Sequence, residues 1–177
     1  TEVYEQSYIT DPAYPYWLIY RNNSFDSVAD KMTFDIFKVY RDRLITKAIT
    51  KPNGKFRVLK SRNIGNNEIV DIDGYDSYID DINSLDVSKF LNQGNCVLVP
   101  NLTYNPRACM LPTGCIADGS VAILTLKNAN TKVSTEDLAF YATSQFNEFY
   151  AIARNRGTRS LNIDNNSVFF FGKLKHA

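Results

Sequence analysis

Short apolar runs dominate the middle of the chain and predict several short strands. Segment 96–127 contains CVLVP, ACML and VAILTL, separated by two prolines and two glycines, with a third proline, Pro100, at the end of the first run. Apolar runs of this length between proline and glycine are typical of strands joined by sharp turns. Apolar and polar residues also alternate over 34–49, which predicts another strand there.

A tight-turn sequence, KPNGK at 51–55, predicts a hairpin. Proline followed by Asn-Gly favours a reversal between two strands, so FRVLKSRNI at 56–64 is expected to return along the preceding strand. The tail SVFFFGKLK, at 167–175, predicts a closing strand. Its three consecutive phenylalanines must be buried on both faces of that strand or covered by a partner.

One long helix is expected near the C-terminus. Ser134 and Asp137 have the spacing of a helix cap, and the predicted helix ends near Gly157. Apolar residues recur at spacings of three and four over this stretch: Leu138, Ala142, Phe146, Phe149, Tyr150 and Ala153. A shorter amphipathic helix is expected over 26–32. The predicted fold class is therefore α+β, a twisted, mostly antiparallel sheet with short helices and one long C-terminal helix.

Composition and charge narrow the function classes. The 177 residues are 44% hydrophobic, which is enough for the core of one domain. The formal net charge is only +1, so affinity for nucleic acid would have to come from local clusters of Lys and Arg. The sequence has no apolar stretch of about 20 residues, which argues against a membrane partner and against export.

The cysteines, the histidine and the acidic residues do not have the spacings of known metal sites or of a catalytic triad. Cys96, Cys109 and Cys115 lack the paired C-x-x-C spacing of zinc sites, so we expect them to be reduced and structural, as in a cytoplasmic protein. The only histidine, His176, argues against a catalytic triad. The acidic stretch 65–86 lacks the ligand order of an EF-hand, and a solvated acidic face is preferred to a calcium site.

The motif TDPAYPYW at 10–17 is close to a catalytic signature with which some DNA methyltransferases bind a base. Ala13 stands where a second proline is needed, and only ten residues precede Asp11. No glycine-rich turn between a strand and a helix follows to bind a methyl donor. The likeness is therefore interpreted as accidental, and we expect no catalytic residue in this chain. The aromatic segment is instead expected to run over the domain surface, held there by Tyr14, Tyr16 and Trp17.

Three loops concentrate Arg, Lys and Asn and are candidate DNA contacts. Arg pairs with guanine and Asn with adenine through two hydrogen bonds, while Lys and Arg neutralise phosphates. The candidates are Arg41, Arg43 and Lys47; Lys60, Arg62 and Asn63; and Arg154, Arg156 and Arg159. The alternative for each cluster is an ordinary solvated face, and cations at a helix end also complement the helix dipole. A basic face opposed to the acidic stretch would let a neutral protein bind DNA.

A polar turn within the strand-rich block supplies four more candidates. Segment PNLTYNPRA, at 100–108, places Asn101, Tyr104, Asn105 and Arg107 where a purely structural role would call for apolar alternation. Asn-Pro is also a common turn opener, so a structural explanation is equally open.

The order of these segments resembles a known family. YWLIYRNNSFDSVADKM, VYRDRLITK, RVLKSRNIG, the block from CVLVP to SVAIL, and the helix FYATSQFNEFYAIARNRG follow one another along the chain. This order is similar to the C-terminal target-recognition domain of adenine-specific DNA methyltransferases from type II restriction-modification systems. The likeness is to the TaqI-like specificity domain and, within it, to the Alw-, Eco- and Esp-type enzymes with asymmetric sites. It covers about 15–174, with VLKSRNIG, VLVP and IADGSVAIL as its more specific motifs.

The resemblance implies a division of the parent enzyme into two parts. Residues 1–24 would be an entry segment from the catalytic domain, and 25–177 the DNA target-recognition domain. This chain would bind double-stranded DNA without a cofactor, while the N-terminal methyltransferase domain would bind S-adenosylmethionine and the flipped adenine. Within this chain, Lys47, Lys60 and Arg156 would contact phosphates. Base edges would be contacted by Arg62, Asn63, Asn105 and Arg107.

Two other interpretations stay open. A fragment of a type I specificity subunit belongs to the same broad class, although two such domains joined by long helices would be expected there. A carbohydrate- or peptide-binding module would use the eleven tyrosines, Trp17 and the acidic stretch. Salt distinguishes these classes, because DNA binding weakens steeply as salt rises whereas stacking on a sugar barely responds.

Overall fold

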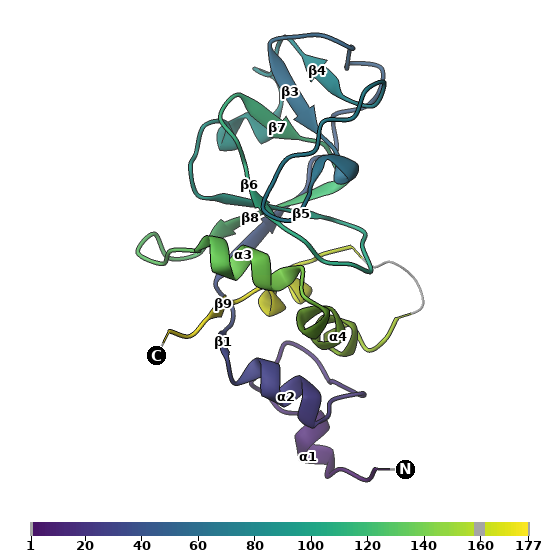
Figure 1. Cartoon of the computed structure of the whole chain (residues 1–177), viewed down its shortest axis with the longest axis vertical. Coiled ribbons are helices and arrows are strands. Elements are labelled where there is room, and N and C mark those ends of the chain that lie inside the picture. The colour runs from purple at the N-terminus through teal and green to yellow at the C-terminus, as the bar shows by residue number, and fades with distance from the viewer. Residues whose placement is uncertain (1, 158–161, 177) are drawn as a thin grey trace.

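Three small sheets form the β part of the molecule. The computed structural model describes residues 2–157 and 162–176. A four-stranded antiparallel sheet lies in the middle, in the order β2 (Phe37–Tyr40), β8 (Val121–Leu126), β5 (Cys96–Pro100) and β6 (Cys109–Met110) (Figure 1). A three-stranded sheet lies above it in the view, in the order β4 (Ser77–Ile79), β3 (Phe56–Leu59) and β7 (Cys115–Ala117). The shortest sheet pairs β1 (Met32–Thr33) with β9 (Lys173–Leu174).

The expected α+β class and the largely antiparallel pairing are confirmed. Only β3 and β7 run parallel; the other strand pairs of the described residues are antiparallel. The several short strands expected within 96–127 are β5, β6, β7 and β8. They do not form one sheet, however, because β7 leaves the four-stranded sheet and pairs with β3.

The middle sheet is covered on both faces, which explains its continuous apolar strands. In β5, Val97 and Val99 belong to one core cluster, while Cys96 and Leu98 belong to another. Successive side chains of a strand point to opposite faces, so each face of β5 contributes to a separate core. One core packs against the helices and is rich in phenylalanine; the other lies beneath the three-stranded sheet.

The prediction of one long C-terminal helix is wrong, because the chain forms two. These are α3 (Thr135–Tyr141) and α4 (Ser144–Ala153). Ser134 and Asp137 form the expected capping box at the start of α3. Thr143 then interrupts the pattern: its hydroxyl donates to the carbonyl of Phe140 at 2.7 Å and accepts from the N–H of Phe146 at 3.2 Å. One side chain thus ends one helix and caps the next, as threonine at an N-cap does.

The predicted hairpin around KPNGK is also wrong. The strand expected over 34–49 stops at Tyr40, because the carboxylate of Asp42 accepts hydrogen bonds from the N–H groups of Leu44 and Ile45 and turns the chain. As a result β2 pairs with β8, while β3 pairs with β4 and β7. KPNGK bends the chain at Pro52, Asn53 and Lys55, and Lys51 makes an isolated bridge with Tyr78.

The tail folds differently from the expected closing strand. It contains a 3-10 helix, η3 (Ser167–Phe170), followed by the two residues of β9. Phe170 and Phe171 are fully buried in the helix-side core, and Phe169 packs partly against it. The domain itself therefore covers this aromatic run.

The aromatic entry segment packs onto the same core. Tyr14 stacks on Phe170, and the hydroxyl of Tyr16 donates to the carbonyl of Ala153 at 2.7 Å. Trp17 was also expected to hold the segment, but it is 63% exposed; the neighbouring Leu18 is the buried residue. Two short helices flank the segment, α1 (Gln6–Ile9) and α2 (Asn23–Ala29), of which α2 lies close to the expected helix. None of the helices in the described ranges is both long and apolar enough to cross a membrane.

Candidate nucleic-acid interface

Two predicted DNA-contacting segments, KSRN and NPRA, lie against each other. KSRN enters η1 (Ser61–Asn63), a 3-10 helix after β3. The guanidinium of Arg107 donates to the carbonyl of Ile64 at 2.6 Å, to that of Ser61 at 3.2 Å and to that of Asn105 at 3.2 Å. Burial lowers the pKa of this guanidinium, but arginine stays charged in proteins. Arg107 therefore clamps the two loops together.

Asn63 is a structural residue, which removes it from the predicted base-reading set. Its side chain is fully buried, with 0% exposure. Its carbonyl oxygen accepts from the N–H of Lys60, and its amide nitrogen donates to the carbonyl of Val70 at 2.9 Å and to Asp76 at 2.7 Å. A group whose hydrogen bonds are all made inside the protein offers nothing to a base edge.

Lys60 and Arg62 remain near the surface and share an aromatic partner. The Lys60 ammonium lies 3.9 Å from the centroid of the Tyr75 ring, and the Arg62 guanidinium carbon lies 4.8 Å from it. Lys60 also donates to the carbonyl of Tyr75 and to the Ser77 hydroxyl. Lys60 is half-buried, whereas Arg62 is exposed. Arg62 is thus oriented by the ring while its donors stay open to a ligand.

The loop between β5 and β6 is braced at both ends. Asn101 is 2% exposed; its side chain donates to Asn162 at 2.6 Å and accepts from the N–H of Ile163 at 3.1 Å. Asn101 is therefore structural as well, contrary to its predicted role in binding DNA. Asn105 is exposed, and its side-chain oxygen accepts from Asn147 of α4 at 3.0 Å. Tyr104 is also exposed on this loop.

Two cavities that share Asp164 are lined by residues of the first basic cluster and by Arg154 of the third. Arg41, Arg43 and Asn162 line a cavity of about 320 Å³ together with Asp164. Asp164 also lines an adjoining cavity of about 250 Å³, with Arg154 and Tyr16. We call this the arginine groove, defined by Arg41, Arg43, Arg154, Asn162 and Asp164. It joins loops that are more than 100 positions apart in the sequence.

Asp164, the acid among the described residues of the arginine groove, already accepts hydrogen bonds from backbone N–H groups. Burial alone raises the pKa of Asp164, but hydrogen bonds from Ser167 and Asn166 outweigh it and hold the pKa below its ordinary value. The ionised carboxylate is therefore favoured, and it accepts from the N–H groups of Asn166 and Ser167 just before and at the start of η3. None of the three arginines of the groove forms an ion pair with a described residue.

Arg156 differs from the other predicted cations because it already has a partner. Its guanidinium forms an ion pair with Glu148 of α4. Its backbone φ is +48°, and that of the preceding Asn155 is +52°. Asn155 ends α4: its own N–H donates to Ile152 and that of Arg156 to Ala151, as in a Schellman motif. The predicted contact residue Arg159 lies outside the described residues.

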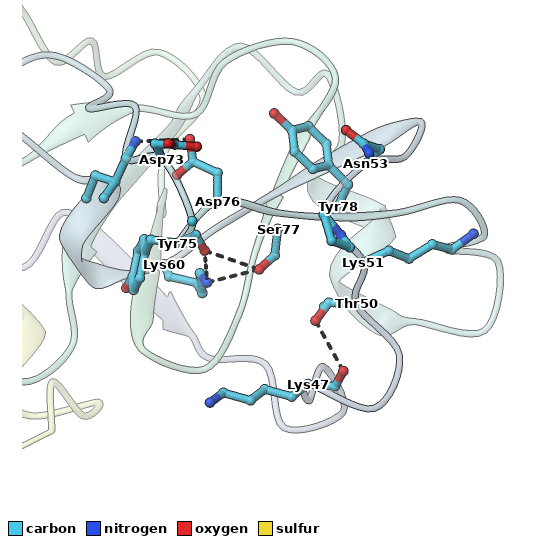
Figure 2. Close-up of a pocket in the computed structure, with 13 residues that line it drawn as sticks. Lys47, Thr50, Lys51, Asn53, Lys60, Asp73, Tyr75, Asp76, Ser77 and Tyr78 are labelled. Atoms are coloured by element: carbon cyan, nitrogen blue, oxygen red, sulfur yellow. Dashed lines mark hydrogen bonds between the residues drawn. The ribbon is translucent and has the colours of Figure 1, made fainter.

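The expected separation of acidic and basic faces is wrong. Asp71 and Asp76 pair with Arg57, and Asp80 pairs with Lys51. Asp73 and Asp76 line a cavity of about 690 Å³ together with Lys47 and Lys60 (Figure 2). The reason is topological, since the acidic stretch returns to β3 as β4 and is brought beside the basic loops.

Sequence reasoning missed several residues that organise this surface. Tyr75 orients two cations, yet its sequence context indicates only an acidic loop. Asn155 is another such residue, and its signal in the sequence is that Asn is a known alternative to glycine after a helix. Its side chain accepts from the N–H of Ile19 at 2.8 Å and donates to the carbonyl of Trp17 at 3.0 Å, which ties the entry segment to α4.

The described residues contain no group of three or more His, Cys, Asp or Glu side chains that could hold a metal ion. Cys96, Cys109 and Cys115 are free thiols, and burial raises the pKa of each. Models of known protein families give no match to this chain, and a search of curated proteins gives none either.

Proposed function

We propose that this chain is the target-recognition domain of an adenine-specific DNA methyltransferase from a restriction-modification system. In this proposal it binds duplex DNA and presents an adenine to the methyltransferase domain of the same parent protein. S-adenosylmethionine binds to that other domain, and the parent enzyme is cytoplasmic. The order of sequence motifs supports the assignment to this family, and the arrangement of the cations supports DNA as the ligand.

The arginine groove is the observation that carries the proposal. Arg41 and Arg43 line one of its two cavities and Arg154 lines the other, and the two cavities share Asp164, whose carboxylate already accepts hydrogen bonds from backbone N–H groups. More broadly, seven of the eight predicted cations in the described ranges form no ion pair with a described residue: Arg41, Arg43, Lys47, Lys60, Arg62, Arg107 and Arg154. Lys51, a neighbour of the first basic cluster, is paired with Asp80, whereas Lys31, Lys132 and Lys175 outside the predicted set also form no ion pair with a described residue. The grouping of arginines along the arginine groove, rather than the lack of ion pairs alone, therefore fits a polyanion.

The roles of the individual residues follow from their exposure. Arg41, Arg43 and Arg154, together with Lys47 and Lys60, are assigned to phosphates. Arg62 lies in η1, and Tyr104 and Asn105 lie in the adjacent loop between β5 and β6. All three are exposed and are assigned to base edges. Asn63, Asn101 and Arg107 hold these loops in place, because their side-chain polar groups bond within the protein.

Binding to random-sequence duplex DNA tests the proposal. Fluorescence anisotropy of labelled duplexes is measured at low and at physiological salt. We expect binding that weakens steeply as salt rises, because bound cations displace counterions from phosphates. A sugar- or peptide-binding module would give either no binding or binding that barely responds to salt. Absence of binding even at low salt contradicts the proposal.

A further inference from the structure

The cavity of about 690 Å³ contains unpaired charges of both signs. It lies between loop 47–53 and the turn that leads into β4. Figure 2 shows Asp73 and Tyr75 on one side, with Lys47 and Thr50 on another. The Nζ of Lys47 forms no hydrogen bond or ion pair with a described residue, and Lys60 bonds only to neutral oxygens and the Tyr75 ring.

Asp73 is the unpaired acid of this cavity. Its neighbours in the sequence are all engaged: Asp71 and Asp76 with Arg57, and Asp80 with Lys51 and the N–H of Lys55. Asp73, in contrast, is exposed and makes no hydrogen bond or ion pair to a described residue. A carboxylate and two ammonium groups thus line one cavity without neutralising one another.

The turn that carries Asp73 is held firmly. The N–H groups of Tyr75 and Asp76 both donate to the carbonyl of Ile72 at 3.1 Å, and Gly74 supplies the positive φ of +71° that this turn requires. The N–H of Ile72 donates in turn to the Asp76 carboxylate at 3.1 Å. The backbone that carries Asp73 is therefore held in place, and its exposed carboxylate lines the cavity two residues from the Tyr75 ring that contacts Arg62.

We infer that Asp73 reads an exocyclic amino group, cytosine N4 or adenine N6, in the major groove of bound DNA. This inference rests on the proposed function and deepens it by naming a specificity-determining residue. A simple anion would not need the carboxylate, and a metal cation would be repelled by the lysines. A DNA strand presents both required groups, because its phosphates suit Lys47 and Lys60 while an amino-bearing base donates to a carboxylate.

The two possible roles of Asp73 predict opposite results. If it is a bystander, removing its negative charge strengthens binding to every duplex alike, because repulsion from phosphates falls. If it accepts from an amino group, Asp73→Ala weakens binding to the preferred site and leaves random DNA bound as well as before or better. Asp73→Asn keeps an acceptor oxygen, so it should retain part of the discrimination that Asp73→Ala loses.

The experiment begins with selection of the preferred duplex from a random pool by the wild-type chain. Each cytosine and adenine of that site is then replaced by an analogue with hydrogen in place of the amino group. We expect one position at which this replacement lowers the affinity of the wild type for the duplex by roughly 5- to 100-fold. At that position the replacement should not lower the affinity of Asp73→Ala any further. Asp30→Ala removes an exposed carboxylate of α2's C-terminal end as the matched control and should behave as wild type.

The outcomes distinguish failure of the role assigned to Asp73 from failure of the proposed function. If duplex DNA binds but no position responds to loss of the amino group, the role of Asp73 is overturned while the proposed function stands. If Asp73→Ala strengthens binding to all duplexes equally and keeps full discrimination, the role is overturned in the same way. If the wild-type chain binds no duplex, the proposed function fails and this inference fails with it.

Discussion

The guanidinium Nε of Arg107 donates to the carbonyl oxygen of Ile64 at 2.6 Å, across 43 positions of sequence. Through this contact the loop between β5 and β6 holds the end of η1. Arg62, Tyr104 and Asn105, which are assigned to base edges, lie on these two segments, so their relative position depends on Arg107. An arginine that sequence suggests as a DNA contact thus acts as a positioning residue.

Arg107→Ala should destabilise the protein by about 2 kcal/mol, because half-buried carbonyls lose their hydrogen-bond donors. Arg107→Lys should recover only part of this loss, since an ammonium cannot reproduce the planar fork of a guanidinium. Urea denaturation of the wild type and both variants measures the free energy of unfolding. Equal stability of all three proteins would contradict the clamp.

Arg62→Ala should leave the free energy of unfolding within about 0.5 kcal/mol of wild type, because Arg62 is exposed and only its contact with Tyr75 is lost. Affinity for the preferred duplex should fall by about 1 to 3 kcal/mol, with relaxed preference at one base pair. Anisotropy with the preferred site and its single-base variants measures both effects. A uniform loss across all sequences would make Arg62 a phosphate contact, and no loss would remove it from the interface.

Arg156→Gly should stabilise the protein by about 0.5 to 1 kcal/mol. A side chain at φ +48° costs about 1 to 2 kcal/mol, of which the entropy of glycine in the unfolded chain cancels part. The lost ion pair with Glu148 is exposed and contributes little. Glu148→Gln serves as the control, since it removes the ion pair without changing the backbone. A clear loss of stability in Arg156→Gly would contradict this account.

Acid should destabilise the protein through Asp76. Burial alone raises the pKa of Asp76, but hydrogen bonds from Asn63 and Ile72 and the charge of Arg57 outweigh it, so the folded pKa lies below the ordinary 3.8. The folded state therefore favours the ionised carboxylate. The resulting stability is present above the unfolded pKa near 3.8 and is lost as pH falls through the folded pKa.

Urea midpoints between pH 6 and pH 2 check this dependence. Asp76→Asn should be less stable than wild type near neutral pH, and its midpoint should fall less as the solution is acidified. Asp30→Asn, at the exposed C-cap of α2, is the control and should follow the pH dependence of wild type. Identical pH dependence of Asp76→Asn and wild type would remove Asp76 from the acid response.

Local sequence signals predicted the elements better than their pairing. The capping box at Ser134 and the apolar runs of β5 and β8 depend on neighbouring residues, and both were visible in the sequence. The break between α3 and α4 escaped because Thr143 sits within an uninterrupted apolar periodicity. The partner of β3 also escaped, because pairing with β7 joins residues that are about 58 positions apart, as Arg57 and Cys115 are.

For the candidate site, residue types indicate which segments are candidate DNA contacts. They do not indicate which side chains are exposed and able to contact a ligand. Asn63 and Asn101 have the chemistry of adenine readers, and only their burial shows that this chemistry is used inside the protein. Arg41 and Arg154 lie far apart in the sequence, and no local pattern indicates that they share a groove. The sequence shows which residue types each segment contains. The solvent exposure of these side chains and the distances between them are known only from the fold.

The salt dependence of DNA binding by a groove variant tests the central claim most directly. The variant replaces Arg41, Arg43 and Arg154 by Ala. A matched control replaces three exposed lysines that form no ion pair with a described residue, Lys31, Lys132 and Lys175. The plot of log affinity against log salt should be shallower for the groove variant than for wild type by about 2 to 3 units, since each phosphate contact contributes about 0.9. The control should keep the wild-type slope. Equal slopes for the groove variant and wild type would contradict the assignment of this groove to DNA.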